Sequence, residues 1–206
     1  MSALHRILFA VAAALVAAPT AVSAASLSVV TVTAPDINCV FNPTCTIVVT
    51  DSAGDIVLPG MSGKAILQSR TFTSASGAPA EGKNGYEYRI DLTQATSAVD
   101  ASCVTDLTID FGPVVQFQYN KVGPKDDVYV VTKGGLGTIG LLSADQNGSK
   151  ITFTFDQPVC AGARGVKGDT TFFFGLAANG KPTDIIATVG SPGFGPTDVK
   201  ARAPVH

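Results

Sequence analysis

The sequence predicts an all-β protein, an antiparallel β-sandwich of the Greek-key or jelly-roll kind with about a dozen short strands and little or no helix. Three observations predict it. Apolar and polar residues alternate with period two along most of the chain, whereas helical periodicity is nearly absent. Turn residues recur between these alternating segments. Finally, the chain holds 14 Asp and only 2 Glu, and Asp favours turns whereas Glu favours helices.

The clearest predicted strand is YEYRIDL, residues 86–92. Its tyrosines and aliphatic residues fall on one face, and Glu87, Arg89 and Asp91 fall on the other. A long Gly- and Pro-containing segment, residues 73–85, is expected to form a mobile hairpin loop or a binding loop. The strongest helical candidate is Thr93 to Ala101. The expected strands are 26–33, 45–50, 64–72, 86–92, 104–111, 114–120, 127–132, 136–143, 150–156, 170–177, 183–189 and 197–203.

The first 24 residues have the organisation of a signal peptide. A cationic start precedes an apolar run over residues 7–18, and Val22-Ser23-Ala24 supplies the small residues of a cleavage site. The apolar run is shorter than the roughly 20 residues that span a bilayer. We therefore expect cleavage after Ala24, one domain over residues 25–206 without a membrane span, and a secreted, periplasmic or extracellular location.

The four cysteines indicate two disulfides, because an even number in an exported chain meets an oxidising compartment. Three pairings are possible. We favour Cys39–Cys45, which closes the turn FNPT, and Cys103–Cys160, which ties two distant strands. A four-cysteine metal site is disfavoured because no C-x-x-C spacing occurs.

Composition excludes several kinds of function. The net charge is −2, so the chain carries no basic footprint for nucleic acid. Its two histidines are His5, in the leader, and His206, the last residue given. An internal Ser-His-Asp arrangement or a multi-histidine metal site therefore cannot form. The sequence predicts a protein that is not an enzyme and that needs no cofactor.

Two sets of acidic residues keep other chemistries open. A glycosidase would need a carboxylate pair, for which Glu87, Asp91, Asp106 and Asp110 are the candidates. The ordinary interpretation of Glu87 and Asp91 is a solvated, partly charge-paired strand face. Calcium is the one metal with candidate ligands on expected tight turns, although the same residues are typical of hairpin turns. These candidates are Asp51, Asp55, Asp126 and Asp127.

Aromatic residues offer a further alternative. The tyrosines could stack on sugar rings, but their positions on core-facing strand residues and the absence of Trp favour packing. Phe172-Phe173-Phe174 alternate in direction along a strand, so one ring must leave the main core. That ring is expected under a loop, in a second layer or in an exposed patch. The tyrosines are Tyr86, Tyr88, Tyr119 and Tyr129.

The segments GYEYRIDL, SCVTDLTIDFGP, VYVVTKGGLGTIGLLSA, KITFTFDQPVCAG, GDTTFFFGLAA and VKARAP resemble those of uncharacterised exported bacterial β-sandwich proteins. Some of these resemble proteins with a Pro-Glu-Pro sorting tail after an Arg-Ala-Pro ending. The resemblance spans most of the chain after the leader. It implies export, but no activity and no site residues.

The sequence therefore predicts an exported, non-catalytic binding or structural module whose partner is an unknown protein or glycan at the cell surface. The segments expected to bind are residues 73–85, the loop Gly134 to Gly137 and the Asp-rich turns. One alternative is a carbohydrate-binding or calcium-stabilised recognition domain. A carboxylate-dependent glycosidase and an assembly protein that pairs through its edge strands are the others.

Overall fold

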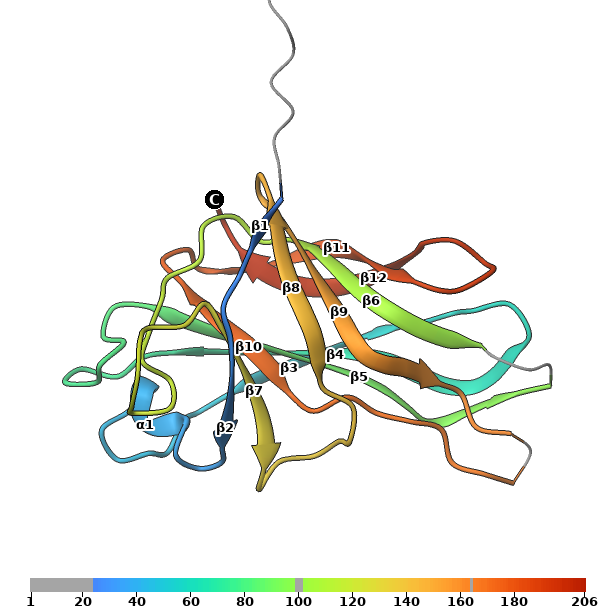
Figure 1. Ribbon diagram of the computed structural model, residues 1–206, viewed down its shortest axis with the longest axis horizontal. Helices are drawn as coiled ribbons and strands as arrows, with labels where there is room; N and C mark the ends of the chain where they lie inside the picture. The colour runs from blue at the N-terminus through green and yellow to red at the C-terminus, as the bar shows by residue number, and fades with distance from the viewer. Residues whose placement is uncertain (1–23, 99–101, 164) are drawn as a thin grey trace, which may run out of the picture.

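The computed structural model describes residues 24–98, 102–163 and 165–206. Across these residues, twelve strands form two six-stranded sheets that pack face to face (Figure 1). The predicted all-β sandwich is thus confirmed. All but the last residue of the predicted signal peptide lies outside the described residues. The helix within the described part, α1 (Asn38–Phe41), is far too short to cross a membrane, and no longer apolar helix occurs there.

Sheet A has the strand order β1-β8-β9-β6-β11-β12, and every neighbouring pair is antiparallel. It carries the disulfide between Cys103 and Cys160, which face each other on adjacent strands β6 and β9. The strands of this sheet are β1 (Ala25–Ser26), β6 (Cys103–Asp110), β8 (Leu141–Asn147), β9 (Lys150–Cys160), β11 (Pro182–Gly190) and β12 (Thr197–Pro204).

Sheet B has the order β2-β7-β10-β5-β4-β3, in which β2 runs parallel to β7 and the other pairs are antiparallel. Its two longest strands, β4 and β5, form a hairpin joined by residues 74–83. The strands of this sheet are β2 (Val29–Thr33), β3 (Thr50–Asp55), β4 (Met61–Thr73), β5 (Asn84–Ser97), β7 (Val128–Lys133) and β10 (Phe174–Ala178).

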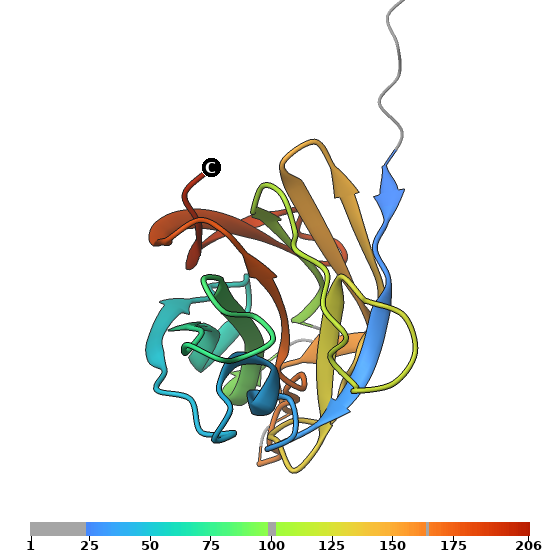
Figure 2. The same ribbon diagram turned by 90° about the vertical axis from the view of Figure 1, so that its left-hand side faces the viewer.

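The predicted first strand, residues 26–33, is divided between the two sheets. Figure 2 shows β1 and β2 as one long segment along a side of the sandwich, with β1 bonded to β8 and β2 bonded to β7. The chain changes sheets at Leu27 and Ser28. Ser28 donates from both its backbone N–H and its hydroxyl to Asp127 Oδ2, at 2.9 Å each. These bonds fix the crossover.

Several predicted elements are wrong in type or position. The strands expected at residues 136–143 and 170–177 begin only at Leu141 and Phe174, as β8 and β10. Residues 45–49 are not a strand, and β3 begins only at Thr50. Residues 114–120 make isolated bridges rather than a strand. The helical candidate at residues 93–101 continues strand β5 as far as Ser97, and residues 99–101 lie outside the described part. In each case the strand boundary follows sheet pairing, which local sequence does not specify.

The main core lies between the two sheets. It takes Tyr86, Tyr88, Ile90 and Leu92 from the inner face of β5, as the alternation predicts. Sheet A contributes aromatic and aliphatic residues such as Phe153, whose ring lies 5.0 Å from that of Phe174.

A second core lies on the outer face of sheet B, where residues 34–49 cover the sheet. Phe41 of α1 is fully buried and packs edge-on against Phe72 at 4.8 Å. Tyr129 and Phe173 come from the strand side of this layer. Because this face is covered, its side chains are shielded from water, which the sequence pattern of β5 does not reveal.

The free edges of the two sheets meet at β3 and β12. A Cβ on Gly54 would collide with the Lys200 backbone oxygen, so only glycine permits this approach. The backbone N–H of Arg202 donates to Ser69 Oγ at 3.3 Å, and its carbonyl accepts from the Tyr88 hydroxyl at 2.7 Å. Part of the β12 edge is therefore already hydrogen-bonded, which reduces its capacity for edge pairing.

Candidate functional site

The outer face of sheet B carries a row of residues that crosses five strands, four of which contribute a polar side chain. Strand register places Asp51 on β3 opposite Arg70 on β4, and Arg70 opposite Glu87 on β5. Glu87 is opposite Gly175 on β10, which in turn is opposite Tyr129 on β7. Residues from five strands thus form one line on the sheet.

Arg70 is shared unequally between the two carboxylates of this row. Its Nε and Nη2 atoms donate to Asp51 Oδ1 and Oδ2 at 3.0 and 3.4 Å. Its Nη1 lies 3.7 Å from Glu87 Oε2, beyond the length of a direct hydrogen bond. The Asp51 side chain is 44% exposed and that of Glu87 only 5%. The more buried carboxylate thus has the weaker contact with the cation.

Gly175 allows Tyr129 to reach Glu87. The Tyr129 hydroxyl donates to Glu87 Oε1 at 3.1 Å, passing over the position where a side chain on Gly175 would lie. A Cβ at residue 175 would come within 2.7 Å of the Tyr129 hydroxyl and would also collide with the Tyr86 backbone oxygen. The missing side chain is therefore a condition for this hydrogen bond.

Burial governs the ionisation of the row. Burial raises the pKa of Glu87, and the charge of Arg70 and the Tyr129 hydrogen bond offset this only in part. Burial likewise raises the pKa of the Tyr129 phenol, which the Glu87 charge raises further. For Arg70, burial lowers the pKa, but the Asp51 hydrogen bond and the two carboxylate charges outweigh it and leave the pKa raised.

A second ion pair and an aromatic ring lie beside the row. Arg89 Nη2 is 2.9 Å from Asp91 Oδ2, and Arg89 Nε donates to Gln68 at 3.1 Å. The ring of Phe173 lies under both guanidinium groups, 4.4 Å from that of Arg70 and 5.3 Å from that of Arg89. Such stacking fixes the orientation of the cations. The face predicted as solvated is therefore corrected: Glu87 is buried, and Arg89 and Asp91 form a partly buried pair.

A cavity of about 410 Å³ opens above this row. Its floor contains Arg70 and Glu87. Three segments form its walls: residues 34–38, residues 47–49 and the β7–β8 loop. The lining is otherwise mainly apolar, with Ala34, Ile37, Ile47, Val49, Val131, Leu136 and Phe173. An apolar cavity with a few convergent polar groups is the usual form of a small-molecule site.

The walls have specific sequence requirements. Gly134 has φ +73°, and a Cβ there would lie 2.6 Å from the Ala34 carbonyl oxygen, so this contact between two walls needs glycine. The Cys39–Cys45 disulfide links α1 to the chain two residues before the wall formed by residues 47–49. In that wall Ile47 and Val49 pack on the second core, whereas Val48 is 90% exposed. The predicted binding loop Gly134 to Gly137 thus contributes three residues, Gly134 to Leu136, to the cavity.

The four candidate glycosidase carboxylates do not converge. Glu87 and Asp91 lie on the outer face of sheet B, whereas Asp106 and Asp110 belong to β6 of sheet A. Within each strand the two are four residues apart, roughly 13 Å, beyond the 5 to 9.5 Å of catalytic carboxyl pairs. Asp51 is nearer to Glu87, but Arg70 stands between them.

The calcium candidates also have other roles. Asp51 and Asp55 lie within β3, so the tight turn expected there is wrong. Asp127 accepts hydrogen bonds from Ser28 and, through Oδ1, from Gln116 at 2.8 Å. The backbone of its neighbour Asp126 bonds to Phe117. Among the described residues, no group of three or more acidic, His or Cys side chains could hold a metal.

The aromatic residues follow the packing interpretation. All four tyrosines are buried, so none offers a ring face to a sugar. Phe174 enters the main core, and Phe173 leaves it for the second core. Of the three places expected for the ring that leaves the main core, the structure shows the second layer. Residues 73–85, expected to form a mobile hairpin loop or a binding loop, connect β4 to β5 and pack on α1: the N–H groups of Ala75 and Ala80 donate to the carbonyls of Phe41 and Val40.

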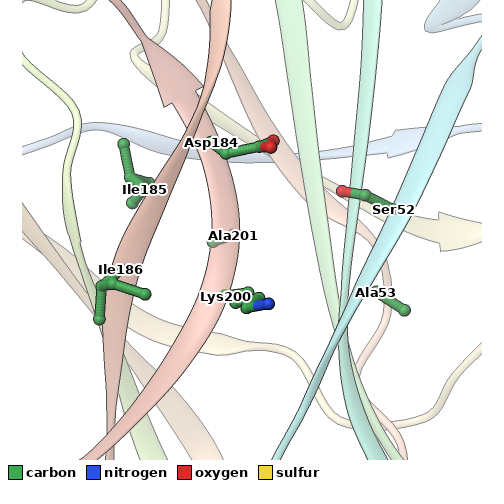
Figure 3. A pocket seen from close by; sticks show the side chains of 7 residues that line it. All are labelled: Ser52, Ala53, Asp184, Ile185, Ile186, Lys200 and Ala201. Atoms are coloured by element: carbon green, nitrogen blue, oxygen red, sulfur yellow. The ribbon is translucent and has the colours of Figure 1, made fainter.

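A second pocket, of about 500 Å³, lies at the seam between β3 and strands β11 and β12. Asp184 and Ser52 point their oxygens toward each other across it, and Lys200 lies below them in the view (Figure 3). The Asp184 side chain is 92% exposed and pairs with Arg202 at 3.5 Å. The cavity on sheet B is therefore the stronger candidate, because its polar floor is shielded from water.

No protein family, curated protein or solved structure matches this sequence. The chemistry of the sheet B cavity is therefore the basis on which a function can be proposed.

Proposed function

We propose that this protein is an exported, non-catalytic binding module that holds a small ligand in the cavity on sheet B. One observation carries the proposal: the cavity combines apolar walls with a buried carboxylate at its floor. Burying a carboxylate without a strong hydrogen-bonding or ionic partner costs stability. Such a group is therefore more often found where it binds a ligand. Export rests on the leader, and the two disulfides are compatible with an oxidising compartment.

A non-catalytic role is supported by what surrounds Glu87. Its neighbours are a guanidinium, a phenol with a raised pKa and apolar side chains. The other candidate carboxylates lie too far away to complete a general acid–base pair with it. This environment suits recognition of a ligand better than turnover of a substrate.

Binding can be tested by titrating the oxidised chain with para-butylbenzyl alcohol, an uncharged probe with an apolar body, while following backbone-amide NMR signals. We expect saturable shifts at Asn38, Gly134 and Gly135, which line the cavity. Absence of binding by both this probe and its amine analogue, or shifts confined to the seam around Ser52 and Lys200, would contradict the proposal.

Neighbouring residues of one wall provide a matched control. Val49→Trp should fill the cavity and abolish these shifts, whereas Val48→Trp should leave them intact because Val48 is exposed and does not line this cavity. Leu136→Trp, at the exposed rim, provides a second blocking variant if Val49→Trp does not fold. If all three variants bind the probe equally, the assignment of the binding site to this cavity is wrong.

A further inference from the structure

We propose that the cavity selects a small organic cation, an ammonium group carried on an apolar body; this inference rests on the proposed binding function. It is drawn from the unequal sharing of Arg70, from the free hydrogen-bonding capacity of Glu87 and from the apolar walls. Together they favour one cationic head and disfavour anionic ligands and ligands with several charges.

The row has one carboxylate more than it has cations. The charges that act on Glu87 are those of Arg70 and Asp51. Arg70 donates two hydrogen bonds to Asp51, and this two-point contact pairs the guanidinium charge mainly with the Asp51 carboxylate. The charge of Glu87 therefore remains only partly compensated, in a place where a low local dielectric strengthens electrostatic interactions.

Glu87 also retains unused acceptor positions. An ionised carboxylate has about four lone-pair sites. In the described structure, the Tyr129 hydroxyl, a neutral donor, occupies one of them at Oε1. Oε2 faces Arg70 across 3.7 Å without a direct hydrogen bond. An ammonium group has three donors and a positive charge, so it supplies both the bonds and the charge that Glu87 lacks.

The remaining lining limits the rest of the ligand. Ile37, Ile47, Val49 and Leu136 present hydrocarbon to the cavity, and Asn38 adds one polar side chain at its wall. A ligand with several charges would lose hydration along these walls without compensation. A carboxylate ligand would bring a like charge to the buried Glu87. The walls and floor together favour one cationic head and an apolar body.

Three probes with the same body test the charge preference: para-butylbenzylamine, para-butylbenzyl alcohol and para-butylbenzoate, titrated at neutral pH by calorimetry. We expect the amine to bind roughly tenfold or more tightly than the alcohol, and the benzoate to bind most weakly. If the alcohol binds in the cavity but the amine binds no more tightly, the cation inference fails while the binding function stands. If no probe binds, the binding function itself fails.

Two substitutions test the mechanism of selection. Glu87→Gln should reduce amine affinity to that of the alcohol, because the amide keeps an acceptor but removes the charge. Asp51→Asn should also weaken amine binding, although Asp51 does not line the cavity, because it frees Arg70 to pair with Glu87. Asp55→Asn, on the same face of β3 but outside the row, is the matched control and should have no effect. Unchanged amine affinity in both Glu87→Gln and Asp51→Asn would overturn the inference.

Discussion

At the scale of the residue, Glu87 determines the character of the site. It is nine-tenths or more buried, its nearest cation is drawn toward Asp51, and its direct hydrogen bond within the described structure comes from a phenol. The free-energy cost of keeping this carboxylate buried depends strongly on each hydrogen bond and charge that still contacts it. Two predictions follow from that dependence, one on the hydrogen bond and one on the charge.

Tyr129→Phe should destabilise the protein by about 1–3 kcal/mol, because it removes the hydroxyl that donates to the buried Glu87. Tyr119→Phe is the matched control. Tyr119 is buried in the same second core, but its hydroxyl lies 3.5 Å from the Val115 carbonyl, a much weaker bond. Chemical denaturation of both variants measures the difference. An equal or larger cost for Tyr119→Phe would contradict the assigned role of Tyr129.

The stability that Glu87 contributes should depend on pH. Because its pKa is higher in the folded protein than its ordinary value of 4.5, the folded state binds this proton more tightly than the unfolded state. Its contribution is then complete below about pH 4.5 and is lost as the pH rises through the folded pKa. The free energy of unfolding of the wild type, relative to Glu87→Gln, should therefore fall as the pH rises from 4 to 7.

Denaturant unfolding at a series of pH values measures this difference. Arg70 and Tyr129, which face Glu87, remain protonated throughout this range because the pKa of each is raised. Asp51 also faces Arg70 and is present in both proteins, so the comparison isolates residue 87. A difference that grows in favour of the wild type with rising pH would show that the Glu87 pKa is lowered instead.

At the scale of the element, the covering segment 34–49 turns an ordinary sheet face into a cavity. It has little regular structure beyond α1, and it is held by the Cys39–Cys45 disulfide and by the packing of Ile37, Phe41, Ile47 and Val49. The second disulfide, Cys103–Cys160, lies between paired strands of sheet A. The two bridges should therefore affect stability and binding differently.

Removal of the Cys103–Cys160 bridge by double Ser substitution should cost about 4 kcal/mol, against about 2 kcal/mol for the Cys39–Cys45 bridge, because the longer loop restricts the unfolded chain more. The two bridges close sequence separations of 57 and 6 residues. Probe binding should show the reverse order, since Cys39–Cys45 holds a wall of the cavity. Denaturation and titration of both variants test this. Weaker binding only in the Cys103–Cys160 variant would contradict it.

At the scale of the whole molecule, sheet B is shared by two cores. Along β7, Val128 and Val130 face the main core, whereas Tyr129 and Val131 face the second. Strand β10 alternates in the same way between Leu176 and Ala177. Because the same strands support both layers, we expect the two cores to unfold together.

Phe41→Ala should accordingly lower the free energy of unfolding by about 3–5 kcal/mol, the cost of truncating a buried aromatic ring. Phe153→Ala, in the main core, is the comparison, since both rings are fully buried. A single cooperative transition is expected for both variants when tyrosine fluorescence, which reports tertiary packing, and far-ultraviolet circular dichroism are followed together. A separate early transition in Phe41→Ala would show that the second core unfolds independently.

Much of the fold follows from local sequence. The alternation of YEYRIDL correctly identifies the inner face of β5, and Phe172-Phe173-Phe174 correctly implies that one ring leaves the main core. Cys39 and Cys45 pair as favoured because a short turn separates them, and Cys103 and Cys160 then pair across β6 and β9. These features depend on strand periodicity and on short-range closure, which are properties of the chain itself.

The site depends on what lies far apart in the sequence. Nothing in YEYRIDL shows that residues 34–49 cover its polar face. The sequence alone therefore predicts that Glu87 is exposed. Arg70 shows no local signal of function within its strand, and its importance arises from strand register with Asp51 and Glu87. The sequence by itself determined the β-sandwich and the pairing of its four cysteines into two disulfides, because strand periodicity and short-range closure are local. Only the tertiary structure decided that Glu87 is buried, because burial and charge pairing come from long-range packing that no local pattern encodes.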